Sequence, residues 1–292
     1  MTDLQSYKPE LPSVMVDDAV RAALREDLGR AGDITTLATI PPDAMANMII
    51  ASREDGVLSG MPLARAAFRA INPDIQFETL IDDGEALAPG DVVARIKGRA
   101  RDVLSAERVA LNYLGHMSGI ATATAQFAAK IAHTNARVCC TRKTTPGLRA
   151  FEKYAVRCGG GANHRFGLDD AVLIKDNHIG VVGDIARTVE TARAYVGHLV
   201  KIEVEVDTLE QLAAVLPAKP DVVLLDNMDA ATLRQAIALV KKLNPATKTE
   251  ASGGIKLDTI AEKAETGVDY ISTGWITHSA PVLDLGLDVA IS

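Results

Sequence analysis

The sequence predicts an α/β protein in two parts, an N-terminal mixed domain followed by an incomplete or closed α/β barrel of the TIM type. Beyond residue 137, short runs of branched apolar residues alternate with amphipathic helical segments. The last four runs recur at roughly 22–25 residues, the length of one strand–helix unit, which requires parallel strands and right-handed crossovers. An open doubly wound sheet is disfavoured because no GxGxxG fingerprint follows the first strand.

The first hundred residues mix helical and strand patterns, which favours a separate α+β domain. Helical periodicity and strand-like runs alternate there, at 13–28 (helix), 46–51 and 56–58 (strands), 61–71 (helix), 75–81 and 92–98 (strands). The stretch 102–131 is helical, but Gly115 and Gly119 interrupt it, so we expect two helices with a break between them. We place the domain boundary at this break, with a first domain at 1–116 and a barrel at 117–275. We expect the segment 276–292 to complete the first domain.

Six strand candidates follow, fewer than the eight of a closed barrel. They cover 137–141, 171–175, 200–206, 221–226, 247–252 and 269–274. Helix candidates between them cover 148–157, 183–196, 208–216, 229–243 and 258–266.

The composition limits the function classes. With 292 residues, 48% hydrophobic and 24% charged, the chain has the make-up of a soluble globule with a sizeable core. A net charge of −7 and 4% aromatic residues argue against nucleic-acid binding. No apolar run approaches the ~20 residues of a membrane span, and MTDLQSYKPELPS does not resemble a secretory signal. Three cysteines without a CxxC motif suit a reducing cytoplasm, and Cys139 and Cys140 fit a buried strand.

One stretch, 141–178, is cationic although the whole chain is acidic. Its basic residues are Arg142, Lys143, Arg149, Lys153, Arg157, His164, Arg165, Lys175 and His178. This local excess predicts a pocket for a small, highly anionic ligand. His164 and Arg165 fall in a loop, where the planar fork of an arginine suits a carboxylate or a phosphate.

Every predicted barrel strand ends in polar groups, and catalytic groups in such barrels lie at the C-terminal strand ends. In chain order these groups are Thr141, Arg142 and Lys143, then Lys175, Glu205, Asp226, Ser252, Gly253 and Gly254, and finally Thr273 and Gly274. The late glycines allow backbone N–H groups to approach a phosphate. Glu205 and Asp226 offer oxygen ligands for Mg²⁺ or for hydroxyl groups. No HExxH, GxSxG or P-loop motif is present, which favours binding and electrostatics over a covalent intermediate.

The strand at 200–206 has an apolar and a charged face. Ile202, Val204 and Val206 alternate with Lys201, Glu203 and Glu205. We expect the charged face to point into the barrel, where ionised groups are costly unless they are paired or bind a ligand. The alternative is an internal salt-bridge network, for example between Lys201 and Glu203.

Several segments together resemble the quinolinate phosphoribosyltransferase family. They are ERVALNYLGHMSGIAT, TRKTTPGLRAFEKYAVRCGGGANHRFGLDDAVLIKDNH, EVEVD, LLDNM, EASGGI and GVDYISTGWITHS, in the family's order over nearly the whole chain. The resemblance implies an N-terminal α/β sandwich domain, an incomplete α/β barrel and a homodimer whose active sites are each completed by the neighbouring chain. It also implies a Mg²⁺-dependent reaction in which quinolinate and phosphoribosyl pyrophosphate give nicotinate mononucleotide, pyrophosphate and CO₂ for de novo NAD synthesis.

The resemblance also assigns roles to residues. Those implied to hold the two quinolinate carboxylates are Arg142, His164, Arg165 and Lys175, with Arg108 from the partner subunit. Lys143, next to Thr141 and Arg142 in the TRK motif, is expected near the pyrophosphate, and Glu205 and Asp226 near the ribose hydroxyls or Mg²⁺, directly or through water. These three are the implied catalytic residues. The implied 5′-phosphate cradle is Ser252, Gly253, Gly254, Thr273, Gly274 and Trp275.

Two departures from the family pattern are Trp275, where a small residue is common, and Gly286, where a serine is usual. Neither removes a charged group. Two alternatives stay open: a related phosphoribosyltransferase acting on nicotinate or another aromatic acid, and a non-catalytic barrel that binds phosphorylated metabolites.

Overall fold

The computed structural model describes residues 9–290 and divides the chain into two compact units. Unit 1 comprises Met1–Ala125, Ala150–Gly160 and Ala280–Ser292, and unit 2 comprises Gln126–Arg149 and Gly161–Ser279. Residues 1–8 and 291–292 lie outside the described residues. They include most of the segment in which no secretory signal was expected and the end of the predicted segment 276–292.

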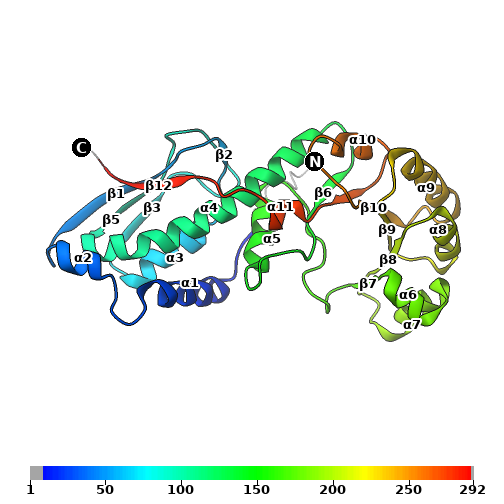
Figure 1. The fold of residues 1–292 in the computed structure, drawn as a ribbon, viewed down its shortest axis with the longest axis horizontal. Helices are drawn as coiled ribbons and strands as arrows, with labels where there is room; N and C mark the ends of the chain where they lie inside the picture. The colour runs from blue at the N-terminus through cyan, green and yellow to red at the C-terminus, as the bar shows by residue number, and fades with distance from the viewer. Residues whose placement is uncertain (1–8, 291–292) are drawn as a thin grey trace. The chain divides into compact units, whose positions relative to one another are not determined.

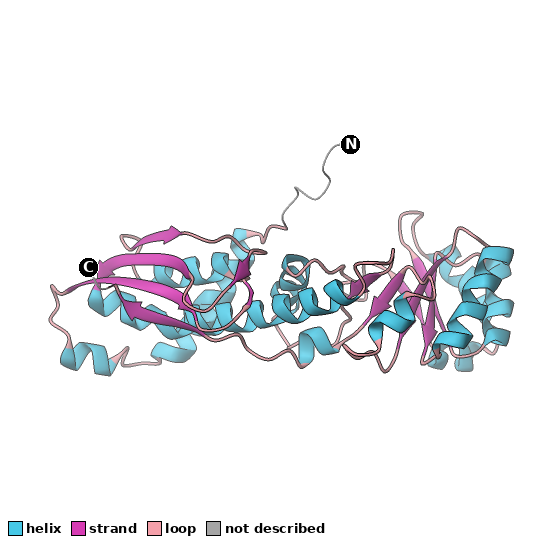
Figure 2. Cartoon of the chain, turned by 90° about the horizontal axis from the view of Figure 1, so that it is seen from above, coloured by secondary structure: helices cyan, strands magenta, loops and turns pink. Residues whose placement is uncertain are grey.

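Unit 1 contains a four-stranded antiparallel sheet and the helices that pack on it (Figures 1 and 2). The strand order is β12 (Leu285–Val289), β1 (Met45–Ser52), β5 (Val92–Arg99), β3 (Gln76–Thr79). Two short strands, β2 (Gly56–Val57) and β4 (Ala86–Leu87), pair separately. The helices are α1 (Ser13–Leu28), α2 (Ile34–Thr39), α3 (Met61–Ile71), most of α4 (Ala100–Lys130) and α5 (Arg149–Cys158).

The alternation along β5 shows why this sheet forms. Exposed Arg95 and Lys97 flank Ile96, which is fully buried. A two-residue period of this kind places one face of the sheet on the core and the other in solvent. Phe68 of α3 is also buried, so the helix contributes to the core of this unit.

The expected break at Gly115 and Gly119 is wrong, because α4 runs without interruption from Ala100 to Lys130. The two glycines instead allow the C-terminal segment to cross the helix closely. A Cβ on Gly119 would lie 2.0 Å from the carbonyl oxygen of Pro281. The N–H of Leu283 donates to the carbonyl of Gly115 at 3.0 Å. The predicted boundary at 116–117 therefore falls inside a continuous helix.

Unit 2 contains six parallel strands in the order β6, β11, β10, β9, β8, β7. Their bounds are β6 Arg137–Cys139, β7 Val172–Ile174, β8 Ile202–Val206, β9 Val222–Asp226, β10 Lys248–Ser252 and β11 Tyr270–Ser272. Each lies within a predicted strand. Neighbours in the sheet follow chain order, except that β6 lies beside β11, and within residues 9–290 no ladder joins β6 to β7. This arrangement is an incomplete barrel, and the predicted fold class is confirmed.

The helices of unit 2 follow the strands in turn, and Figure 1 shows α7, α8 and α9 along their outer side. They are α6 (Asp176–Val182), α7 (Ile185–Tyr195), α8 (Leu209–Val215), the 3₁₀ helix η2 (Leu216–Ala218), α9 (Ala230–Leu243), α10 (Ile260–Ala264) and α11 (Trp275–His278). The side chains of Asp184, Thr208 and Asp229 cap α7, α8 and α9 by accepting backbone N–H groups. The short helix α6 was not predicted.

The apolar face of β8 is packed as expected, since Ile202, Val204 and Val206 are each 1% exposed or less. Cys139 and Cys140 are buried, as predicted. Across residues 9–290, none of the helices combines the length and the apolar character that a membrane crossing requires.

We predict that Gly119→Ala destabilises the protein, by about 1–3 kcal/mol or more, because the new methyl group would overlap the backbone of Pro281. Gly180→Ala on α6 is the matched control. No atom lies within 4 Å of the position that its new methyl group would take, so helix propensity alone should stabilise that variant by up to about 1 kcal/mol. Thermal and denaturant unfolding measure both effects. A gain in stability for both variants would contradict the close crossing of α4.

Candidate functional site

The carboxyl ends of the parallel strands in unit 2 meet at one edge, and several predicted site residues lie there together. The Lys175 ammonium group after β7 pairs with the Glu205 carboxylate on β8. Asp226 at the end of β9 is in register with Ser252 at the end of β10. The prediction that the polar groups at the strand ends lie at one edge is confirmed for Lys175, Glu205, Asp226 and Ser252.

Two arginines at this edge carry unused donors in buried positions. The Nε atoms of Arg142 and Arg165 are buried and have no hydrogen-bond partner within the part of the chain that the structure describes. Arg165 is anchored by a 3.0 Å hydrogen bond from Nη1 to the carbonyl of Ala171. Burial lowers the pKa of Arg165, and the charge of Arg142 lowers it further, while Glu203 opposes the shift. Two neighbouring guanidinium groups with buried, unused N–H donors favour an anion between them.

Lys143 is held by its backbone while its side chain is exposed. Its N–H donates to the Thr141 hydroxyl at 3.0 Å, and its carbonyl accepts from the Thr277 hydroxyl at 2.8 Å. The side chain passes close to Gly274, where an added Cβ would lie 2.9 Å from Lys143 Cδ. A glycine at 274 therefore makes room for the lysine stem.

The Ser252–Gly253–Gly254 loop has a backbone conformation that residues other than glycine rarely adopt. Gly253 and Gly254 have φ values of +83° and +63°. A Cβ on Gly253 would lie 2.0 Å from Asn227 Oδ1. Asn227 also donates its N–H to the Ser252 carbonyl at 3.0 Å and its side-chain amide to Asp226 at 2.6 Å. The loop is thus fastened to the end of β9, with glycines where φ is positive and where Asn227 approaches closely.

Two carboxylates at the strand ends could contact a metal or hydroxyl groups. The Glu205 side chain is 13% exposed and is paired with Lys175, whereas Asp226 accepts a hydrogen bond from Asn227. Mg²⁺ commonly uses one or two carboxylates and takes its remaining ligands from phosphates and water. This donor set therefore fits a Mg²⁺ ion that arrives with a phosphorylated substrate.

His164 directs both ring nitrogens into the protein. Nδ1 accepts the N–H of Arg165 at 2.8 Å, and Nε2 lies 2.9 Å from Glu203 Oε2 and 3.7 Å from Glu250 Oε1. A direct hydrogen bond from this ring to a ligand would require one of these contacts to open. The alternative pairing of Lys201 with Glu203 is wrong, because Lys201 binds Asp221 at 2.6 Å.

Glu250 was missed by the sequence reasoning. It is 5% exposed and faces Glu203 and His164 from β10. Burial raises its pKa, the neighbouring Glu203 carboxylate adds to this effect, and His164 opposes it. The available signal was an acidic residue in the middle of a strand, the same signal that drew attention to Glu203.

Other cations of the predicted stretch have local structural roles. Arg149 donates from Nε to the Thr144 hydroxyl and from Nη1 to the Phe166 carbonyl, each at 3.0 Å. His178 Nδ1 accepts the N–H of Lys175 at 3.0 Å and so caps α6. Lys153 and Arg157 lie on α5, in unit 1.

Two further predicted site residues occupy different units. Trp275 begins α11 in unit 2, is 39% exposed, and lies with its ring 5.8 Å from that of Phe127. The backbone N–H of Trp275 donates to the Thr273 hydroxyl at 3.3 Å. Arg108 is exposed on α4, in unit 1.

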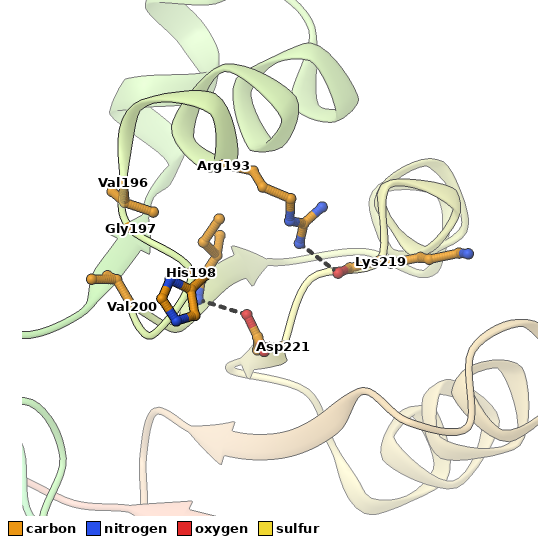
Figure 3. A pocket seen from close by; sticks show the side chains of 8 residues that line it. Arg193, Val196, Gly197, His198, Val200, Lys219 and Asp221 are labelled. Atoms are coloured by element: carbon orange, nitrogen blue, oxygen red, sulfur yellow. Dashed lines mark hydrogen bonds between the residues drawn. The ribbon is translucent and has the colours of Figure 1, made fainter.

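A cavity of about 600 Å³ lies near the amino end of β8, away from the carboxyl ends of the strands (Figure 3). Arg193 and Lys219 contribute to its lining. The guanidinium of Arg193 donates to the carbonyls of Ala218 and Lys219 at 2.7 Å each. These hydrogen bonds cap the C-terminal end of η2. The cavity contains none of the predicted site residues.

The chain matches two family descriptions. They are "Quinolinate phosphoribosyl transferase, N-terminal domain" over residues 33–118 and "Quinolinate phosphoribosyl transferase, C-terminal domain" over residues 120–288. The chain is 43% identical over 268 residues to the probable nicotinate-nucleotide pyrophosphorylase (carboxylating) of Bacillus subtilis (strain 168), covering 91% of each chain. It is 42% identical over 274 residues to the nicotinate-nucleotide pyrophosphorylase (carboxylating) of Mycobacterium leprae (strain TN), covering 93% of this chain and 96% of that one.

A solved structure is similar over nearly the whole chain. It is the nicotinate-nucleotide pyrophosphorylase from Francisella tularensis, with a TM-score of 0.90 and 36% sequence identity. The match covers 98% of this chain and 99% of that one.

Proposed function

Because the chain belongs to the quinolinate phosphoribosyl transferase family, we propose that it transfers a phosphoribosyl group from phosphoribosyl pyrophosphate to quinolinate. The products are nicotinate mononucleotide, pyrophosphate and CO₂, and the reaction serves de novo NAD synthesis. The observation that carries this proposal is the pair of arginines, Arg142 and Arg165, whose buried Nε donors have no partner within residues 9–290.

The cations at the strand ends suit a ring with two carboxylates. Arg142 and Arg165 offer planar donor groups, and Lys175 adds a third charge from the adjoining strand end. An aromatic acid with one carboxylate would need fewer cations. We therefore favour quinolinate over nicotinate, with Arg108 of the partner subunit as a further contact.

The acidic and glycine-rich strand ends suit the phosphorylated sugar. As the ring nitrogen attacks C1 and the bond to pyrophosphate breaks, positive charge develops on the ribose, which Glu205 and Asp226 would stabilise. Lys143 would neutralise the departing pyrophosphate. The same two carboxylates would hold Mg²⁺, directly or through water, and the ion would supply further positive charge beside the phosphates.

The remaining contacts and steps follow from the same placement. The loops Ser252–Gly253–Gly254 and Thr273–Gly274–Trp275 would hold the 5′-phosphate, with backbone N–H groups as donors. Loss of CO₂ from the adduct leaves the electron pair on the ring carbon, which then takes up a proton.

We also propose a cytoplasmic homodimer with shared active sites. The exposed position of Arg108 on α4 is compatible with a contact to a second copy. No disulfide joins the three cysteines within residues 9–290, which suits a reducing compartment.

The first prediction of this proposal concerns products. With quinolinate, phosphoribosyl pyrophosphate and Mg²⁺, the protein is expected to release CO₂ and pyrophosphate in equal amounts, and chelation of Mg²⁺ should abolish turnover. Preference for nicotinate would reassign the substrate. Binding of phosphoribosyl pyrophosphate without release of pyrophosphate would indicate a non-catalytic barrel.

Arg142→Ala should weaken quinolinate binding about 100-fold or more, because losing one member of a buried charge pair costs about 3–5 kcal/mol. Calorimetric titration with quinolinate measures the effect. Arg137→Ala is the control. It removes the same charge at the exposed amino end of β6, opposite the carboxyl end that Arg142 follows, and should bind quinolinate normally. Unchanged affinity in Arg142→Ala would exclude this residue from the site.

Shared sites predict complementation between inactive variants. Arg108→Ala and Lys175→Ala should each be nearly inactive alone, whereas a mixture that has exchanged subunits should regain about a quarter of the activity, because one site in a mixed dimer keeps both residues. Initial rates after mixing measure this recovery. Activity that stays at the level of the parents, although mixed dimers are detected by mass spectrometry, would assign Arg108 to its own chain.

A further inference from the structure

A buried cluster of His164, Glu203 and Glu250 lies among the strands of unit 2, and the proposed chemistry gives the two acids no role. Glu203 is 7% exposed and Glu250 is 5% exposed. The Oε1 atom of each is buried and makes no hydrogen bond within the described part of the chain. Burying two carboxylates side by side is costly, so the arrangement calls for a compensating role.

The hydrogen bond that His164 accepts from Arg165 fixes which ring nitrogen carries the proton. Nδ1 accepts the Arg165 N–H at 2.8 Å, so the lone pair is on Nδ1 and the proton is on Nε2. Nε2 lies 2.9 Å from Glu203 Oε2 and 3.7 Å from Glu250 Oε1, so both carboxylates are within ion-pair distance of the protonated nitrogen. A metal ion at this position would need the lone pair of Nε2, which this tautomer does not offer. The cluster is therefore arranged to hold the imidazole ring.

The ring in turn holds Arg165. Its Nδ1 fixes the backbone N–H of Arg165, while the Ala171 carbonyl fixes Nη1 at 3.0 Å. Both ends of the arginine are thus restrained, and its Nε remains buried without a partner among residues 9–290. A guanidinium held in this way loses little conformational freedom when an anion binds.

We propose that Glu203 and Glu250 are positioning residues which, through His164, hold the Arg165 guanidinium ready for a ring carboxylate. This inference rests on the proposed function, because it takes quinolinate as the ligand of Arg165. Neither acid touches the substrate. Their effect should therefore appear in quinolinate binding and leave phosphoribosyl pyrophosphate binding unchanged.

The test compares Glu250→Ala, Glu250→Gln and Glu203→Gln with the wild type. Quinolinate affinity by calorimetry and both KM values are measured on each full-length protein. Glu250→Ala and Glu203→Gln should weaken quinolinate binding about 10-fold, the scale on which supporting residues act in other sites. Glu250→Gln keeps an oxygen and the side-chain size at the carboxylate that lies farther from His164 Nε2, at 3.7 Å, and should restore most of the affinity. Glu203→Gln also keeps an oxygen, but it removes the charge that lies 2.9 Å from His164 Nε2 and that also acts on Arg165. The KM for phosphoribosyl pyrophosphate should not change in any variant.

Lys248→Ala is the matched control, because Lys248 begins the same strand and binds Asp269 at the surface at 2.7 Å. It should bind both substrates normally. If Glu250→Ala does not fold, the comparison between Glu203→Gln and the wild type decides.

Three results would overturn the proposal: equal increases in both KM values, unchanged quinolinate affinity in Glu203→Gln, or stoichiometric Zn²⁺ binding by the wild type that Glu250→Gln abolishes. Failure of the proposed function is seen separately. In that case the wild type itself neither binds quinolinate nor releases pyrophosphate.

Discussion

The approach of two guanidinium groups, Arg142 and Arg165, is the constraint on which the site depends. Their mutual repulsion and their burial both act against the charged form of Arg165. The protein opposes this with Glu203 and Asp170, yet it leaves both Nε donors without a partner in the described chain. Two buried guanidinium groups stay close in a folded protein only if the surrounding structure holds them there. A bound anion would offset their repulsion and accept from their Nε donors. The parallel sheet makes the pair possible, because it directs successive strand ends to one edge.

The neighbouring segments hold this edge by close contacts that only small residues permit. Gly274 allows the Lys143 stem to pass, and Gly253 allows Asn227 to fasten one strand end to the next. Both glycines lie near the positions proposed for the phosphates. In unit 1, Gly119 serves packing alone, since it admits the C-terminal segment against α4. The same residue type thus allows close contacts at the proposed binding edge in unit 2 and in the assembly of the fold in unit 1.

The sequence predicted the strands and their polar ends because both depend on short-range patterns. A two-residue alternation is visible in KIEVEV, and the order of the strands follows from the regular spacing. Contacts between distant residues were not accessible in this way. The break at Gly119 was wrongly predicted because its partner, Pro281, is remote in the chain. The inward direction of both His164 nitrogens could not be foreseen either, because their carboxylate partners come from β8 and β10.

The ion pair between Lys175 and Glu205 shows how the site is balanced without substrates. In the proposed function these residues serve different ligands, since the lysine binds a carboxylate of the ring and Glu205 binds the ribose or its metal. Each group therefore has a partner in the free protein, which limits the cost of partly burying its charge. In that proposal, binding both substrates replaces the internal Lys175–Glu205 ion pair with two contacts to ligands, one from the lysine to a ring carboxylate and one from the glutamate to the ribose or its metal. Arg142 and Arg165 have no comparable exchange for their Nε donors, so the gain in free energy on binding quinolinate should be concentrated at the two arginines.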